Sequence, residues 1–98
     1  MRLEITERDF SQQIIDLNRK ANLGWNIYRT WSSRHSPAGF PDLTLLRDKV
    51  LLFAELKSEK GKVSPAQEEW LQGLSLVETV DVHLWRPSQW PEIEEVLR

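Results

Sequence analysis

Three charged residues, Asp42, Glu55 and Lys57, combine side-chain types and a spacing that suit metal-assisted hydrolysis. Residues two apart in a strand point to the same face, so Glu55 and Lys57 project together while Leu56 points into the core. Two neighbouring carboxylates repel each other unless a cation lies between them, and Mg²⁺ commonly binds one or two carboxylates together with phosphate oxygens and water. A lysine beside such a metal can orient the attacking water and stabilise the charge of the transition state. This chemistry is phosphodiester hydrolysis, with Asp42, Glu55 and the Leu56 backbone carbonyl as metal ligands.

A predicted hairpin brings the two carboxylates together. Residues 42–47 and 49–57 read as strands joined at Asp48, and the start of one hairpin strand lies opposite the end of the other. Asp42 is therefore expected beside Glu55. The alternative is that Asp42 only follows a turn proline, and that the other two charges form an exposed ion pair worth about 0–1 kcal/mol.

The remaining elements follow from caps, chain breakers and apolar periodicity. Thr6 caps a first helix that ends at Gly24, and its apolar face holds Phe10, Ile14, Leu17 and Ala21. Then come a strand over residues 25–31, a loop to residue 41 and the hairpin, whose second strand carries the apolar run 50–54 and is expected in the middle of the sheet. A helix over residues 65–74, capped by Ser64, and a strand over residues 80–85 follow. Ser88 caps a last short helix, from which Ile93, Val96 and Leu97 face the core. The predicted order is αβββαβα.

Composition narrows the function classes. The chain has 98 residues, 13 Lys and Arg against 15 Asp and Glu, and no Cys. The missing Cys excludes disulfides, thiolate catalysis and Cys-built metal sites, and it fits a reducing cytoplasm. No apolar stretch approaches the roughly 20 residues of a membrane helix, and no secretory signal is visible.

Charge is distributed unevenly along the chain. Residues 1–18 carry a net −2, residues 19–62 carry +5 and residues 63–98 carry −5. A local excess of cations can hold a polyanion on an acidic chain, because exposed charges are screened beyond about 8–10 Å. A solvated surface with chance clustering is the alternative.

The five Trp and two His residues are candidates for base stacking and for metal binding, respectively. Aromatic faces can stack on single-stranded bases, but Trp25, Trp70, Trp85 and Trp90 fall inside elements at positions compatible with burial. Trp31 is the exception, because it adjoins a loop. The strand residue His83 is expected on the solvent side, and neither His enters the predicted metal site.

Several motifs together resemble a known nuclease family. They are GFPDL at 39–43, AELK at 54–57, SPAQEEWL at 64–71 and VHLWRPSQW at 82–90. The pattern is similar to the PD-(D/E)xK nuclease superfamily and specifically to its VRR-NUC branch, in the small standalone form of phages and bacteria. The resemblance implies one VRR-NUC domain over residues 1–98. It implies an α/β fold with an αβββαβ restriction-endonuclease-like core, a central mixed sheet flanked by helices, and a short extra C-terminal helix.

The resemblance also implies roles for individual residues. Asp42 and Glu55 become metal-binding carboxylates and Lys57 the catalytic lysine. Glu7 matches an acidic residue of the family's first helix, at the rim of the site; alternatively, it only suits the helix dipole. Gln67 matches a glutamine on the helix after the E-x-K strand; alternatively, it only completes a capping box with Ser64.

Cations that flank the cluster are candidates for phosphate contacts, which position DNA without reading its sequence. They are Arg29, Arg34, Lys60 and Lys62, and His35 is a weaker candidate that can equally be an exposed loop residue without a role.

The expected function is a Mg²⁺- or Mn²⁺-dependent endodeoxyribonuclease that cuts branched DNA, such as four-way (Holliday) junctions, as a homodimer in DNA repair. It is expected in the cytoplasm of a bacterial or phage-infected cell, without a membrane partner. The alternatives are a nuclease subunit acting on flaps, ends or single strands in a repair or replication assembly, and a non-catalytic DNA-binding module of the same fold.

Overall fold

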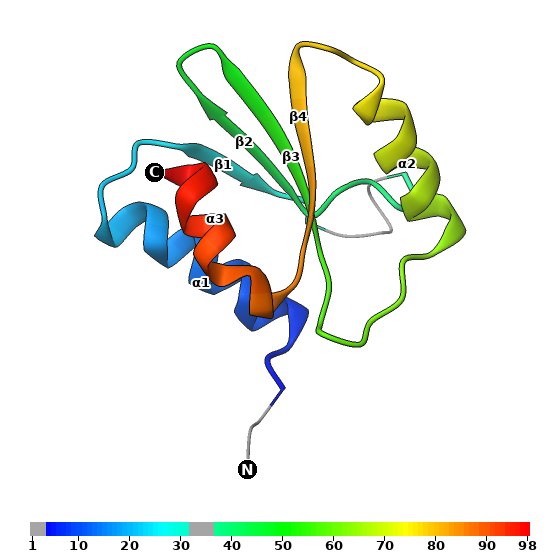
Figure 1. Ribbon diagram of the computed structural model, residues 1–98, viewed down its shortest axis with the longest axis horizontal. Coiled ribbons are helices and arrows are strands. Elements are labelled where there is room, and N and C mark those ends of the chain that lie inside the picture. The colour runs from blue at the N-terminus through cyan, green and yellow to red at the C-terminus, as the bar shows by residue number, and fades with distance from the viewer. Residues whose placement is uncertain (1–3, 32–36) are drawn as a thin grey trace.

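A computed structural model describes residues 4–31 and 37–98 and shows an α/β fold built on a mixed four-stranded sheet (Figure 1). The helices and strands are α1 (Glu7–Lys20), β1 (Asn26–Arg29), β2 (Leu43–Arg47), β3 (Val50–Leu56), α2 (Pro65–Ser75), β4 (Val80–Trp85), the 3-10 helix η1 (Pro87–Gln89) and α3 (Trp90–Leu97). The sheet order is β1-β2-β3-β4, antiparallel except for the parallel pair β3 and β4. The predicted order and the interior position of β3 are confirmed.

The hairpin of β2 and β3 closes as predicted. Arg47 pairs with Val50 across a two-residue turn, and Asp48 adopts φ 53°, a left-handed conformation that Asp tolerates better than most residues. The register fixes which side chains share a face. Alternate residues of both strands, among them Leu45 and Leu52, form one buried apolar surface.

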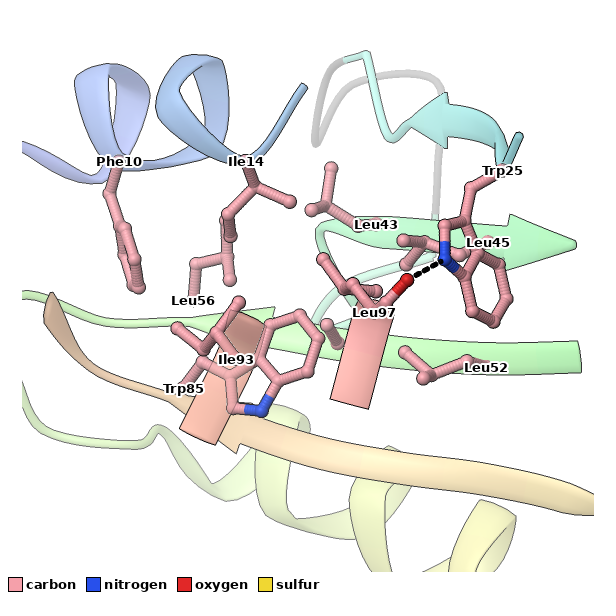
Figure 2. Packing of buried hydrophobic residues seen from close by; sticks show 11 residues of the cluster. Phe10, Ile14, Trp25, Leu43, Leu45, Leu52, Leu56, Trp85, Ile93 and Leu97 are labelled. Atoms are coloured by element: carbon pink, nitrogen blue, oxygen red, sulfur yellow. Dashed lines mark hydrogen bonds between the residues drawn. The ribbon is translucent and has the colours of Figure 1, made fainter. Parts of the chain in front are cut away.

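The helices cover the two faces of the sheet unequally. Helices α1 and α3 pack on one face and enclose the main core, whereas α2 lies on the other side (Figure 1). Figure 2 shows side chains from α1, β2, β3, β4 and α3 meeting in this core, where the Trp25 indole Nε1 donates to the Leu97 carbonyl at 2.9 Å. On the α2 side, the Phe40 ring makes edge contacts with Phe53 of β3 and Trp70 of α2.

Helix α1 ends earlier than its apolar pattern predicts. Asn22, not Gly24, is the left-handed residue that stops it, at φ 54°. The backbone N–H of Leu23 reaches the Asn18 carbonyl and that of Asn22 the Arg19 carbonyl, which is a Schellman motif. Ala21 therefore lies exposed in the turn and not on the buried face.

The C-terminal segment also differs from expectation. Ser88 does not cap α3, because it lies inside the 3-10 turn and its backbone N–H donates to the Glu59 carboxylate. Ile93 and Leu97 are buried as predicted, but Val96 is exposed. Within the described residues, no helix has the length and apolar character needed to cross a membrane.

The aromatic residues separate into buried and exposed groups. Trp25 and Trp85 are buried, and Trp70 and Trp90 are half-buried, so most of the predicted core role is confirmed. Trp31 is 76% exposed. His83 was expected on the solvent side, but it is half-buried and stacks on Trp85 with ring centroids 5.1 Å apart. This burial lowers the pKa of His83, an effect that the Asp81 charge opposes.

Candidate active site

The hairpin register sets Asp42 against Glu55. Leu43 pairs with Ala54, so the residues next to them lie opposite each other at the end of the two strands. The Asp42 carboxylate oxygen Oδ2 accepts a hydrogen bond from the Leu56 backbone N–H at 2.9 Å, which ties the start of β2 to the end of β3. The predicted proximity of the two carboxyl groups is therefore confirmed as geometry.

Glu55 is a buried carboxyl group whose pKa is strongly raised. Its side chain is 1% exposed, and its Oε2 atom is buried without a hydrogen-bond partner within the part of the chain that the structure describes. Burial raises the pKa of Glu55 from 4.5 to about 9, with further increases from the adjacent Asp42 carboxylate and from Glu7, against a lowering by Lys57. In the absence of a cation this group is therefore a neutral carboxylic acid at pH 7.

Lys57 extends the cluster toward α1. It is 8% exposed, and its Nζ lies 3.9 Å from Glu7 Oε1, while its backbone N–H donates to the Trp85 carbonyl. Glu7 is half-exposed at the start of α1. The structure thus brings four predicted site residues together: Asp42 directly before β2, Glu55 near the end of β3, Lys57 directly after β3, and Glu7 at the start of α1.

The segment before Asp42 is held against the first turn of α2. Gly39 has φ 82°, and a methyl group there would lie 2.6 Å from the Gln67 backbone nitrogen and closer still to the Ala66 carbonyl. Only glycine fits both restrictions. The glycine of the GFPDL motif therefore allows the chain to approach α2 and then enter β2 at the candidate site.

Gln67 completes a capping box, which is one of its two predicted roles. Its side-chain Oε1 accepts from the Ser64 backbone N–H at 2.8 Å, and its own backbone N–H donates to Ser64 Oγ at 3.2 Å. The amide oxygen is thus engaged within its own helix. A role of Gln67 in the active site stays a prediction.

A cavity of about 550 Å³ opens beside the carboxylate cluster. It is lined by Glu7, Arg8, Ser11, Arg29, Thr30, Trp31, Asp42 and Leu56. Arg29 was predicted as a phosphate contact, and its guanidinium Nη2 donates to Gln12 of α1 at 2.9 Å. Sequence reasoning did not select Arg8 or Trp31 for the site. Two sequence features could have identified them: Arg8 directly follows Glu7, and Trp31 lies beside a loop.

The other predicted DNA contacts lie elsewhere or are not described. Lys60 lines a different cavity, together with Glu4, Glu59 and Ser88. Lys62 is exposed in the loop before α2. Arg34 and His35 lie outside the described residues.

The donor set fits a small divalent cation that also binds its substrate. In the described part of the chain, no group of three His, Cys, Asp or Glu side chains is arranged to hold a metal. Asp42 and the buried, unsatisfied Glu55 Oε2 offer two carboxylates, and Leu56 borders the cavity beside them. Mg²⁺ is commonly held by one or two carboxylates, with phosphate oxygens and water completing an octahedron.

Comparison with known families agrees with this geometry. The model of the VRR-NUC domain matches residues 4–84, which include all four residues of the cluster. The chain belongs to the VRR-NUC family. This is a nuclease family of the PD-(D/E)xK superfamily, so the predicted family and nuclease class are confirmed.

Solved structures resemble this chain to different degrees. A VRR-NUC domain protein, at 18% sequence identity, superposes with a TM-score of 0.68 over 97% of this chain and 84% of its own. The Holliday junction resolvase Hjc of Archaeoglobus fulgidus, at 24% identity, gives a TM-score of 0.47 over 78% of this chain and 67% of its own. No curated protein matches the sequence.

Proposed function

We propose that this VRR-NUC domain is a divalent-metal-dependent DNA endonuclease whose active site is Asp42, Glu55 and Lys57, with Glu7 at the rim. The carrying observation is the pair of adjacent carboxyl groups, one of them buried with an unsatisfied oxygen, beside a nearly buried lysine. An unpartnered buried carboxylate is costly unless a cation compensates it. The pair therefore favours a metal site over a structural role.

Each residue contributes a separate part of the reaction. Asp42 and Glu55 would hold Mg²⁺ or Mn²⁺, with the Leu56 carbonyl as a further oxygen ligand. When bound, the metal would polarise the scissile phosphate and lower the pKa of a water molecule. Lys57 would orient that water and stabilise charge on the phosphoryl oxygens. Glu7, 3.9 Å from the Lys57 ammonium, would hold the lysine in place and accept a hydrogen bond from the water.

The preferred substrate is proposed to be branched DNA, cut by a homodimer. The local positive charge of residues 19–62 supports binding to a polyanion. Two opposing strands of a four-way junction require two active sites related by two-fold symmetry, which a dimer supplies. A non-catalytic module is disfavoured, because both carboxylates and the lysine are present and adjacent.

Cleavage of matched substrates tests this proposal. A four-way junction, a flap, a single strand and a linear duplex are incubated with the protein in Mg²⁺ and in Mn²⁺, beside Lys57→Ala, and the solution mass is measured in parallel. Symmetric nicks across the junction by a dimer, lost in the variant, are the expected result. Cutting only flaps or ends as a monomer would replace the proposed substrate, and absence of cutting on every form would overturn the nuclease activity.

A further inference from the structure

The cavity beside the carboxylate cluster has a mixed lining. Glu7 and Asp42 contribute carboxylates, whereas Arg8, Arg29 and Trp31 contribute two cations and an indole ring. Its volume of about 550 Å³ lies within the range of roughly 300–1,000 Å³ that is usual for small-ligand sites.

Thr30 ties the segment that carries Arg29 and Trp31 to the segment that carries Asp42. Its backbone N–H donates to the Asp42 carbonyl at 2.8 Å, and its hydroxyl donates to the Pro41 carbonyl at 2.6 Å. The backbone bond continues the antiparallel register of β1 and β2 by one residue, and the hydroxyl bond adds a second tie to the residue before Asp42. Trp31, the next residue, is therefore anchored close to Asp42 through the backbone.

Exposure of Trp31 is unusual for this chain. It is 76% exposed, whereas the other four tryptophans are buried or half-buried. An exposed aromatic ring that lines a cavity is a suitable surface for a nucleobase. Arg8 and Arg29 line the same cavity and are suitable contacts for the phosphates of that nucleotide.

We propose that this cavity is a subsite for one unpaired nucleotide, with Trp31 stacking on its base and Arg8 and Arg29 contacting its phosphates. The inference rests on the proposed function, because a DNA substrate at Asp42 is what brings a nucleotide to the cavity. A base that is paired and stacked inside a duplex cannot present its face to the indole. The subsite therefore selects DNA with an unpaired base next to the scissile phosphate, such as a bulge, a single-stranded arm, or a four-way junction whose branch-point bases unpair on binding.

The test compares binding to two substrates that differ only in one unpaired base. A fluorescent adenine analogue, 2-aminopurine, is placed at the unpaired position of a bulged duplex, and the control is the same duplex fully paired. Binding is measured in EDTA, so that no cutting occurs. Trp31→Ala removes the ring and Trp31→Phe keeps an aromatic face. Tyr28→Ala is the matched control, because Tyr28 is 57% exposed on β1, just before Trp31, and does not line the cavity.

The expected result is a loss of affinity of about 5-fold to 150-fold for the bulged duplex in Trp31→Ala. Trp31→Phe should stay within a few-fold of wild type, and Tyr28→Ala and the fully paired duplex should show no change. The wild type should quench 2-aminopurine by stacking, and Trp31→Ala should not.

Equal affinities of Trp31→Ala and Tyr28→Ala for the bulged duplex, or quenching that does not depend on Trp31, would overturn the subsite. An equal loss of affinity for both duplexes would also overturn the subsite. It would mean that Trp31 contacts the sugar-phosphate backbone of the DNA and not an unpaired base. A protein that cuts no DNA in Mg²⁺ or Mn²⁺ would refute the proposed nuclease activity, whereas the metal-free quenching would still decide the subsite.

Discussion

Replacing Glu55 by Gln should stabilise the metal-free protein, and the gain should grow with pH. The pKa of Glu55 is raised from 4.5 to about 9 in the folded state. Between these values the folded chain holds a proton that the unfolded chain releases, so the free energy of unfolding falls as pH rises. The stability associated with this group is complete below pH 4.5 and is lost progressively up to about pH 9.

The size of the effect follows from the shift. Each pKa unit corresponds to about 1.4 kcal/mol, so at pH 7.5 the ionisable group costs about 4 kcal/mol relative to a neutral one. Gln has nearly the shape of protonated Glu and does not ionise. The stability difference between Glu55→Gln and wild type should therefore increase by about 1.4 kcal/mol per pH unit between pH 5 and pH 8.

Urea denaturation at pH 5, 6.5 and 8 in EDTA measures this difference. Titrating groups that do not interact with Glu55 are common to both proteins and cancel. Glu69→Gln is the control, since Glu69 is exposed on α2 and should stay within about 0.5 kcal/mol of wild type at every pH. Parallel stability curves for wild type and Glu55→Gln would refute the reasoning. Added Mg²⁺ should raise the stability of wild type at pH 8 and have little effect on Glu55→Gln, because the metal ligand is lost.

Three further substitutions test how the frame around the site is held. Gly39→Ala should lower the free energy of unfolding by about 2 kcal/mol or more, because of its φ of 82° and the overlap with α2; an unchanged urea midpoint would contradict the account. Gln67→Ala should lower the free energy of unfolding by about 1 kcal/mol, whereas Gln67→Glu retains the capping box. Equal thermal midpoints of the two variants would show that the capping box contributes nothing. Arg86→Met should lower the free energy of unfolding by about 2 kcal/mol and speed amide hydrogen exchange in residues 58–61. The reason is that the Arg86 guanidinium donates to the carbonyls of Ser58 at 2.6 Å and Gly61 at 2.8 Å. Unchanged exchange in these residues would refute the prediction.

The sequence was sufficient for the hairpin and for the meeting of its charged ends. Apolar residues define both strands, and those of β3 form a continuous run over residues 50–54. The two-residue turn at Asp48 then allows only one pairing register between β2 and β3. That register alone places Asp42 opposite Glu55. The strand over residues 80–85 was also predictable, since an apolar strand pattern lies between a turn and Pro87.

Features that depend on distant contacts were not predictable in the same way. The complete burial of Glu55 and the approach of Glu7 to Lys57 follow from how α1 docks against the end of β3, which no local pattern specifies. Ser88 reads as a helix cap, but the Glu59 carboxylate captures its backbone N–H from a loop 29 residues earlier. His83 alternates with apolar residues and reads as exposed, whereas Trp85 on the same face covers part of it.

Cleavage by the Asp42→Asn variant tests the central claim most directly. A four-way junction and a flap are incubated with wild type and variant in Mg²⁺, with EDTA as the metal-free control, after both proteins are shown to have the same thermal midpoint. Asn keeps an oxygen that can accept from the Leu56 N–H but removes the charge of one metal ligand. We expect cleavage by wild type only in the presence of metal, and a loss of about 100-fold or more in the variant. Undiminished cleavage by Asp42→Asn, or cleavage by wild type in EDTA, would contradict a metal-dependent site at these carboxylates.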